Sequence, residues 1–232
     1  MRRLEGEQAT ADSFAWLAVQ LHSAGSVEKT IDAVVQFALD ALDCSYAGVA
    51  LRSSARAEIP AVTDAVVTDI FQFQLDRRSG PLIETMHGSP AVLVRDTHKD
   101  DRWPEWAAKV AGLGVSSALD LPLQIGDPPA ETVGVLALYS PEADAFDMEH
   151  EATAHILARH ASVAVTAARR LQNLTAAVDA RKVVGQAMGI LMERYSLDED
   201  RAFQVLKRYS QESRRKLRDV AEELIGSRNL PK

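Results

Sequence analysis

Cysteine is almost absent from this chain, which has one cysteine, Cys44, among 232 residues. A single cysteine excludes an intrachain disulfide framework and a cysteine-based zinc cage. No apolar run approaches the roughly 20 residues that a membrane-spanning helix needs. The first residues turn acidic early and lack the apolar stretch of a secretory signal. We therefore expect a cytoplasmic protein that has no membrane partner.

Signatures of catalysis are also missing. The sequence contains no nucleophile elbow, no phosphate-binding loop of the Walker type and no glycine-rich dinucleotide motif that opens a helix. His150 and His155 are five residues apart, which places their rings about 140° apart around a helix and prevents them from sharing a metal. The pair Asp100 and Asp101 is typical of a helix-capping loop. We expect no catalytic residue, no cofactor and no metal, and hence no enzyme.

The charge of the chain is unevenly distributed. The composition is that of a globular protein, with 47% hydrophobic and 25% charged residues and a net charge of −7. Residues 181–232 contain twelve Lys or Arg and eight Asp or Glu, a net charge of +4, whereas residues 1–180 carry −11. Residues 207–218 have six basic residues and one acidic residue. This asymmetry indicates an acidic body with a basic interaction arm, although a solvated helix face would give the same composition.

Periodicity predicts helices first, then mostly adjacent strands, then helices again, which is the order of an α+β domain. The expected helices cover residues 13–23 and 27–42, and a weaker strand and helix fall near residues 63–75. The expected strands cover residues 44–51, 91–94, 119–125 and 132–139. Pro122 belongs at a sheet edge or a bulge.

A long helix is expected from Met148 onward. Its heptad spacing favours a homodimeric coiled coil, although the helix could instead pack only against its own domain. The expected seam contains Leu157, Ala164, Leu171 and Val178, with Ala167 and Leu174 three places further on. Two short helices should close the chain. We expect Ser196 and Glu199 to form a capping box, Ser213 to cap the last helix, and Gly226 to end it.

Residues 11–170 resemble a GAF sensory domain. The segments that carry the resemblance are Gly80–Glu84, Gly88–Val94, Asp101–Glu105, Gly114–Leu123, Val133–Ser140 and Ala145–Asp147. The resemblance implies a central antiparallel sheet with helices, and often a small-molecule ligand or a role in dimerisation. The family geometry would line a ligand pocket around Tyr46, Val94, Asp96, His98, Trp103 and Leu119. Ordinary core and loop positions are the alternative for these residues.

Residues 171–232, the end of the helical stalk and a small three-helix unit, include a stretch that resembles an ANTAR domain, the RNA-binding antitermination module of bacterial regulators. Its carriers are Arg181–Arg194, Ala202–Leu206, Ser210–Ser213 and Lys216–Ala221. The resemblance implies binding to paired hairpins in mRNA leaders, which would prevent a terminator hairpin. This sequence departs from the family at Met188, where many members are polar or basic, and at Arg214, where Asn is common.

The arm has the side chains that bind RNA loops, namely aromatic rings, hydrogen-bonding groups and cations. The expected RNA-binding residues are Arg181, Gln186, Arg194, Tyr195, Arg208, Tyr209, Ser213, Arg214, Arg215, Lys216 and Arg218. The alternative is a DNA-binding transcriptional regulator with a GAF sensor, although no clear base-reading helix is visible. A GAF-type enzyme that reduces oxidised methionine would need more reactive cysteines than Cys44.

Overall fold

The computed structural model describes residue 19 and residues 26–53, 57–127 and 130–227. Contacts divide the chain into two compact units, Met1–Arg169 and Arg170–Lys232, and each unit is described by itself. The helix expected at residues 13–23 lies outside the described residues except for Val19. No helix in the described part of the chain is long and apolar enough to cross a membrane.

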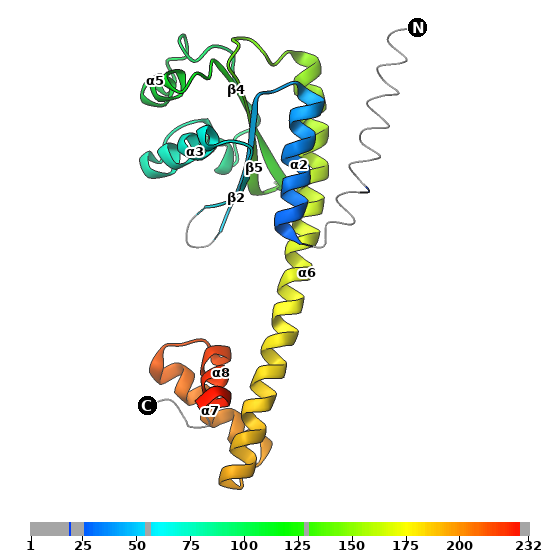
Figure 1. Cartoon of the computed structure of the whole chain (residues 1–232), viewed down its shortest axis with the longest axis vertical. Coiled ribbons are helices and arrows are strands. Elements are labelled where there is room, and N and C mark those ends of the chain that lie inside the picture. The colour runs from blue at the N-terminus through cyan, green and yellow to red at the C-terminus, as the bar shows by residue number, and fades with distance from the viewer. Residues whose placement is uncertain (1–18, 20–25, 54–56, 128–129, 228–232) are drawn as a thin grey trace. The chain divides into compact units, whose positions relative to one another are not determined.

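The N-terminal unit is an α+β fold around a five-stranded antiparallel sheet, as the sequence predicts (Figure 1). The strands are β1 (Tyr46–Leu51), β2 (Glu58–Val62), β3 (Val92–Val94), β4 (Ser117–Ile125) and β5 (Glu131–Ser140), in the order β2-β1-β5-β4-β3. The helices are α2 (Val27–Leu42), α3 (Ala65–Arg77), α4 (Pro81–Met86), α5 (Pro104–Gly112) and the first part of α6 (Met148–Tyr195).

Two strands in the centre of the sheet approach each other closely because one position has no side chain. Gly134 of β5 lies opposite Leu51 of β1. A Cβ atom at this glycine would lie 2.6 Å from the backbone oxygen of Ala50. Pro122 lies in the part of β4 that extends beyond its pairing with β3, which ends at Asp120. The proline therefore occupies a free edge, where its missing N–H costs no ladder hydrogen bond.

Two helical layers cover the two faces of this sheet, as Figure 1 shows. α2 and the first part of α6 pack on the face that carries Leu119, Leu121 and Leu123. α3, α4 and α5 pack on the opposite face, which carries Ala118 and Tyr139. The alternation along β4 explains this division, because successive side chains of a strand point to opposite faces.

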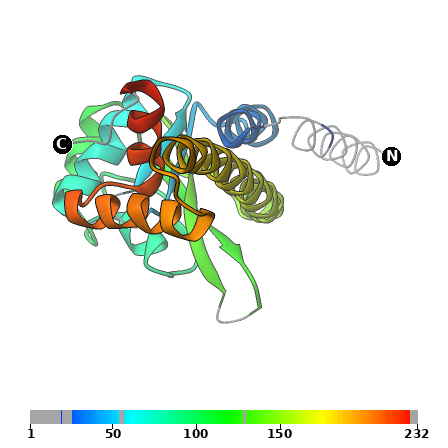
Figure 2. The same ribbon diagram turned by 90° about the horizontal axis from the view of Figure 1, so that it is seen from below.

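The C-terminal unit is a three-helix arrangement made by the end of α6, α7 (Glu199–Ser213) and α8 (Leu217–Ser227). Figure 2 shows α7 and α8 beside the C-terminal part of α6. Small and branched side chains from all three helices form its core, namely Ala187, Leu191, Ala202, Leu206, Val220, Ala221 and Leu224. The members of this set that α8 contributes, Val220, Ala221 and Leu224, are all buried.

All three predicted helix boundaries in this unit are wrong. Asp198, rather than Ser196, caps α7 and accepts a hydrogen bond from the backbone N–H of Arg201 at 2.8 Å. Ser196 has φ 51°, a left-handed conformation outside the N-cap region. Ser213 is the last residue of α7, and its hydroxyl donates to the carbonyl of Tyr209 at 2.6 Å. Gly226 lies inside α8, which extends to Ser227.

The predicted coiled-coil seam is also wrong at its start. Leu157 is fully buried in the core of the N-terminal unit, and Ala164 is half-buried. Leu157 is therefore engaged within its own unit. Leu171, Leu174 and Val178 are 58%, 66% and 63% exposed. The exposed apolar side chains of α6 thus include Val163, 70% exposed, within the N-terminal unit and continue through Leu171, Leu174 and Val178.

Candidate nucleic-acid interface

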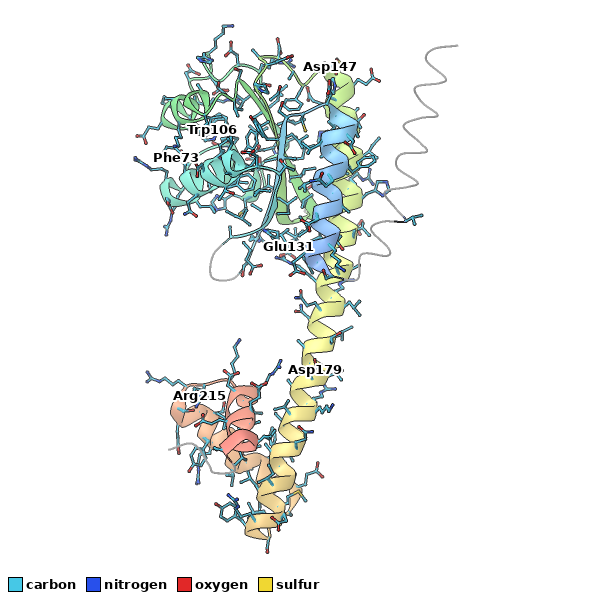
Figure 3. All side chains as sticks on the ribbon, viewed as in Figure 1. Phe73, Trp106, Glu131, Asp147, Asp179 and Arg215 are labelled. Carbon is cyan, nitrogen blue, oxygen red and sulfur yellow. The ribbon has the colours of Figure 1, made fainter. Side chains whose placement is uncertain are left out.

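The basic segment 214–216 forms the connection between α7 and α8. Arg214 is the C-cap of α7 and has a left-handed conformation, with φ 53°. The hydroxyl of Ser210 donates to the carbonyl of Arg215 at 2.6 Å, and the N–H of Arg215 donates to the carbonyl of Ser210 at 3.1 Å. These reciprocal bonds fix the turn, and Figure 3 shows Arg215 at this junction. The turn therefore holds three consecutive cations at one place on the surface.

The expected RNA-binding cations differ in whether they have an intramolecular partner. Arg215 pairs with Glu223, Arg218 with Glu222 at 2.7 Å, and Arg208 with Glu212 at 3.9 Å. Among the described residues, no carboxylate lies within ion-pair distance of a second set, Arg181, Arg214 and Lys216. The second set carries charge that no described acid neutralises, which makes it the stronger candidate for phosphate.

Gln186 and Arg194 lie together, as a shared RNA contact requires. Both line a hollow of about 570 Å³ with Gly189, Ile190, Glu193 and Ile225. The side-chain amide of Gln186 offers both donors and an acceptor, whereas the guanidinium of Arg194 offers only donors. The hollow therefore combines an apolar wall with groups that can hydrogen-bond a base edge.

The remaining three candidates differ in accessibility. The ring of Tyr195 is 52% exposed at the end of α6, so it can stack on a base. Tyr209 is half-buried and packs against the core of the three helices. Ser213 already donates its hydroxyl to Tyr209, which leaves the oxygen of that hydroxyl only as an acceptor. Of the two tyrosines, Tyr195 is thus the more open platform.

Sequence reasoning missed a second hollow in the same unit, a groove of about 610 Å³ between α6, α7 and α8. Arg181 and Arg218 line it together with Met192 and Phe203. The signal that could have revealed it is the pair Gly185 and Gly189, which lie one turn apart on α6. Two glycines inside a helix lower its stability and call for another explanation.

The ligand-binding residues expected in the N-terminal unit differ in their surroundings. The side chain of Asp96 accepts from the N–H of His98 at 2.9 Å and pairs with Lys99 at 2.7 Å. The hydrogen bond from Lys99 lowers the pKa of Asp96. Asp96 and His98 thus form a local loop cluster. Tyr46 is half-buried at the start of β1.

Trp103 lies in a hollow of about 310 Å³, with Phe73 and Arg77. The Nε1–H of Trp103 donates to Glu84 at 3.1 Å, and the guanidinium of Arg102 lies 4.5 Å from a Trp103 ring centroid. Two further residues expected around this pocket lie on opposite faces of the sheet. Val94 faces the α3–α5 layer, whereas Leu119 faces the α2–α6 layer.

A group of polar side chains lies in the core beneath α3, α4 and α5. Thr85 Oγ1, Trp106 Nε1 and both carboxylate oxygens of Asp120 are buried and have no hydrogen-bond partner among the described residues. Figure 3 labels Trp106 and Phe73 within this helical layer. Burial raises the pKa of Asp120 to about 8. Burial and then the nearby Asp120 raise the pKa of Tyr139.

The described residues contain no cluster of three or more side chains that could hold a metal ion. Cys44 is buried, donates its thiol to the carbonyl of Ala38 at 3.6 Å, and has its pKa raised by burial to about 12. Such a thiol is protonated near neutral pH and a poor nucleophile.

Family models match two parts of the chain, a GAF domain at residues 24–166 and an ANTAR domain at residues 172–225. The fold is similar to the GAF domain of an Acinetobacter phosphoenolpyruvate-protein phosphotransferase, with 14% identity and a TM-score of 0.52 over 71% of this chain and 98% of that chain. The corresponding domain from Coxiella burnetii has 17% identity and a TM-score of 0.54, over 71% and 96%. A Stigmatella aurantiaca phytochrome photosensory core module has 11% identity and a TM-score of 0.56, over 89% and 44%. No curated protein gives a significant match.

Proposed function

We propose that this chain, which belongs to the GAF domain family and carries a C-terminal ANTAR domain, is an RNA-binding regulator of transcription antitermination. The observation that carries the proposal is the ANTAR match over residues 172–225, the same unit that holds the excess of positive charge. Its supporting geometry is the exposed turn at Arg214–Lys216, where two of three cations have no acidic partner among the described residues. RNA binding depends on such cations because they neutralise phosphates and release counterions.

The proposed target is a pair of short hairpins in an mRNA leader. Binding would stabilise these hairpins at the expense of a competing terminator hairpin, so that transcription continues. Cations on phosphates would position the RNA, and contacts to splayed bases would supply specificity. This mechanism needs no covalent step, and we accordingly propose a non-enzymatic cytoplasmic regulator.

We also propose a homodimer through α6. Leu171, Leu174 and Val178 lie at intervals of three and four residues, which places them on one side of the helix. All three are largely exposed, although leucine and valine are usually buried in soluble proteins. A second copy of the helix would cover this stripe and place two ANTAR domains in one particle, which matches the need to engage two hairpins.

For the GAF domain we propose a sensory role with a small polar ligand. The support is that buried polar atoms of Thr85, Trp106 and Asp120 have no hydrogen-bond partner in the part of the chain that the structure describes. Buried polar atoms are nearly always hydrogen-bonded, so a group of unsatisfied ones calls for a water molecule or a ligand. A screen of small polar metabolites by thermal shift tests this. We expect a stabilising compound whose effect disappears in Asp120→Asn.

Crosslinking of the full chain to nucleic acid in cells, followed by sequencing of the bound RNA and of the bound DNA, tests the proposed function. We expect enrichment of leader segments that contain two hairpins ahead of a terminator. Recovery of duplex DNA fragments instead of leaders would favour the alternative, a DNA-binding regulator with a GAF sensor. If no RNA is enriched although the protein is abundant in the cell, the proposal is contradicted.

A further inference from the structure

The groove between α6, α7 and α8 has an apolar interior and an open mouth. Val184, Met188 and Leu217 are partly buried against the three-helix core and line it. Met192 and Phe203 also line it and remain 37% and 36% exposed. A phenyl ring and a thioether at the mouth of a hollow present a flat, polarisable surface to whatever enters.

Two glycines line this groove, although the fold of α6 does not require glycine at either position. Gly185 and Gly189 are both exposed on α6 and line the groove. Apart from its chain neighbours and the backbone of α6 itself, a Cβ atom at either position would meet no heavy atom within 4 Å. Alanine would therefore fit, and alanine is the better helix former. The glycines lower the stability of α6 and keep one wall of the groove free of side chains.

The charged residues around the groove suit a nucleotide. Arg181 and Arg218 line it, and Arg181 has no carboxylate within ion-pair distance among the described residues. Glu199 and Asp200 line it as well. Arginine binds phosphate, and a carboxylate can accept a hydrogen bond from an exocyclic amino group of a base. The apolar interior would contact the face of the base.

We propose that this groove receives one unpaired base from the loop of an RNA hairpin. Phe203 and Met192 contact the face of the base, and Arg181 holds an adjacent phosphate. The base packs against the helix backbone at Gly185 and Gly189, where a side chain would exclude it. This inference rests on the proposed RNA-binding function and adds to it the place where a base is bound. It also gives a physical reason for two glycines in a helix whose own packing does not require them.

The test uses the full chain and an RNA hairpin selected by the wild-type chain from a pool with a randomised loop. The test variant is Gly185→Ala with Gly189→Ala, and the matched control is Gly226→Ala. Gly226 lies in α8 of the same unit, also with open space at its Cβ position, and does not line the groove. We expect the test variant to melt at an equal or higher temperature and to bind the hairpin about tenfold more weakly, as for loss of one stacked base. The control should keep wild-type affinity.

Abasic substitution at each loop position provides the second measurement. At one loop position, loss of the base should weaken binding to the wild-type chain. Loss of the same base should cause no further weakening of binding to the double alanine variant or to Phe203→Ala. Unchanged hairpin affinity in the alanine variant would overturn the proposed base pocket while leaving the RNA-binding function intact. If the alanine variant has a changed oligomeric mass and an unchanged RNA affinity, the groove binds a second copy of the chain. This result would also overturn the proposed base pocket. If no hairpin is selected at all, the proposed function itself fails.

Discussion

Individual side chains determine how the C-terminal unit would contact phosphate. Arg214 and Lys216 have no acidic partner among the described residues, whereas Arg215 pairs with Glu223. A cation that already has an acidic neighbour loses part of its attraction for phosphate. The free cations should therefore contribute more to RNA affinity than their number alone suggests.

Replacing Arg214 and Lys216 with glutamine should flatten the salt dependence of hairpin binding. Each phosphate contact contributes about 0.7–0.9 log units of slope, so the double variant should lose roughly one to two. Affinity should fall to a similar extent for all hairpins, since phosphates carry no sequence information. Fluorescence anisotropy across a salt series measures both quantities. Arg215→Gln is the matched control, with a smaller expected loss, and an equal or larger loss there would contradict the account.

In the N-terminal unit, Asp120 should make stability depend on pH. Burial raises the pKa of this carboxyl from 3.8 to about 8. Between these two values the folded chain holds a proton that the unfolded chain releases, so stability decreases as pH rises through this window. The slope attributable to one such group is at most about 1.4 kcal/mol per pH unit. Denaturant unfolding from pH 5 to 8 should show a shallower decrease for Asp120→Asn. An identical pH profile would show that Asp120 does not titrate as described.

Among the secondary-structure elements, α7 begins with a cap that can be tested directly. Asp198 accepts from the N–H of Arg201, and removing an N-cap side chain costs about 0.5–2 kcal/mol. Asp198→Ala should therefore destabilise the C-terminal unit by that amount. Ser196→Ala and Ser213→Ala should each cost less than Asp198→Ala, because neither serine is an N-cap. Thermal unfolding followed by helical circular dichroism compares the three variants. A larger loss for Ser196→Ala would restore the capping box that the sequence suggested.

The exposed stripe on α6 makes a prediction about assembly. Replacing Leu171 and Leu174 with glutamate should yield monomers, because an apolar dimer contact cannot bury unpaired charges. The helix itself should survive, since both side chains are exposed. Light scattering at micromolar concentration gives the mass, with Asn173→Glu as a control at a neighbouring position off the stripe. A wild-type mass that is already monomeric, or one that the double variant does not change, would contradict the proposed dimer.

The sequence predicted some elements closely and others poorly, for identifiable reasons. The helix expected at residues 27–42 is α2 to the residue, because its apolar spacing and its Ser26 cap agree. The seam failed at Leu157, because a seven-residue repeat does not reveal whether a residue faces a partner or its own domain. The spacing of Ser196 and Glu199 alone suggested a cap at Ser196. The backbone of Ser196 is left-handed, and the helix is capped by Asp198 instead.

The candidate site was predictable only in part. The positive charge and the basic turn could be read from the sequence, since composition and spacing suffice for them. The groove at Gly185, Gly189 and Phe203 could not, because its walls come from three helices whose packing decides which side chains stay open. The partners of Arg215 and Arg218 were equally hidden, since they depend on where α8 places its glutamates.

At the scale of the whole molecule, the chain divides its charge unevenly between its two domains. The N-terminal part is strongly acidic and should repel RNA, whereas the C-terminal part is basic. In this account the first domain senses a signal and the second binds the transcript. A fragment of residues 1–169 should therefore fold as an α+β domain and bind no hairpin.

Equilibrium competition is the most direct test of the central claim that the C-terminal unit binds hairpin RNA. The full chain would be bound to a labelled hairpin pair taken from a crosslinked leader and challenged with the unlabelled pair or with duplex DNA of equal charge. The account predicts that the unlabelled hairpins displace the label at concentrations at least tenfold lower than the duplex, and that the fragment of residues 1–169 gives no signal. Equal displacement by duplex DNA, or binding by the fragment alone, would contradict it.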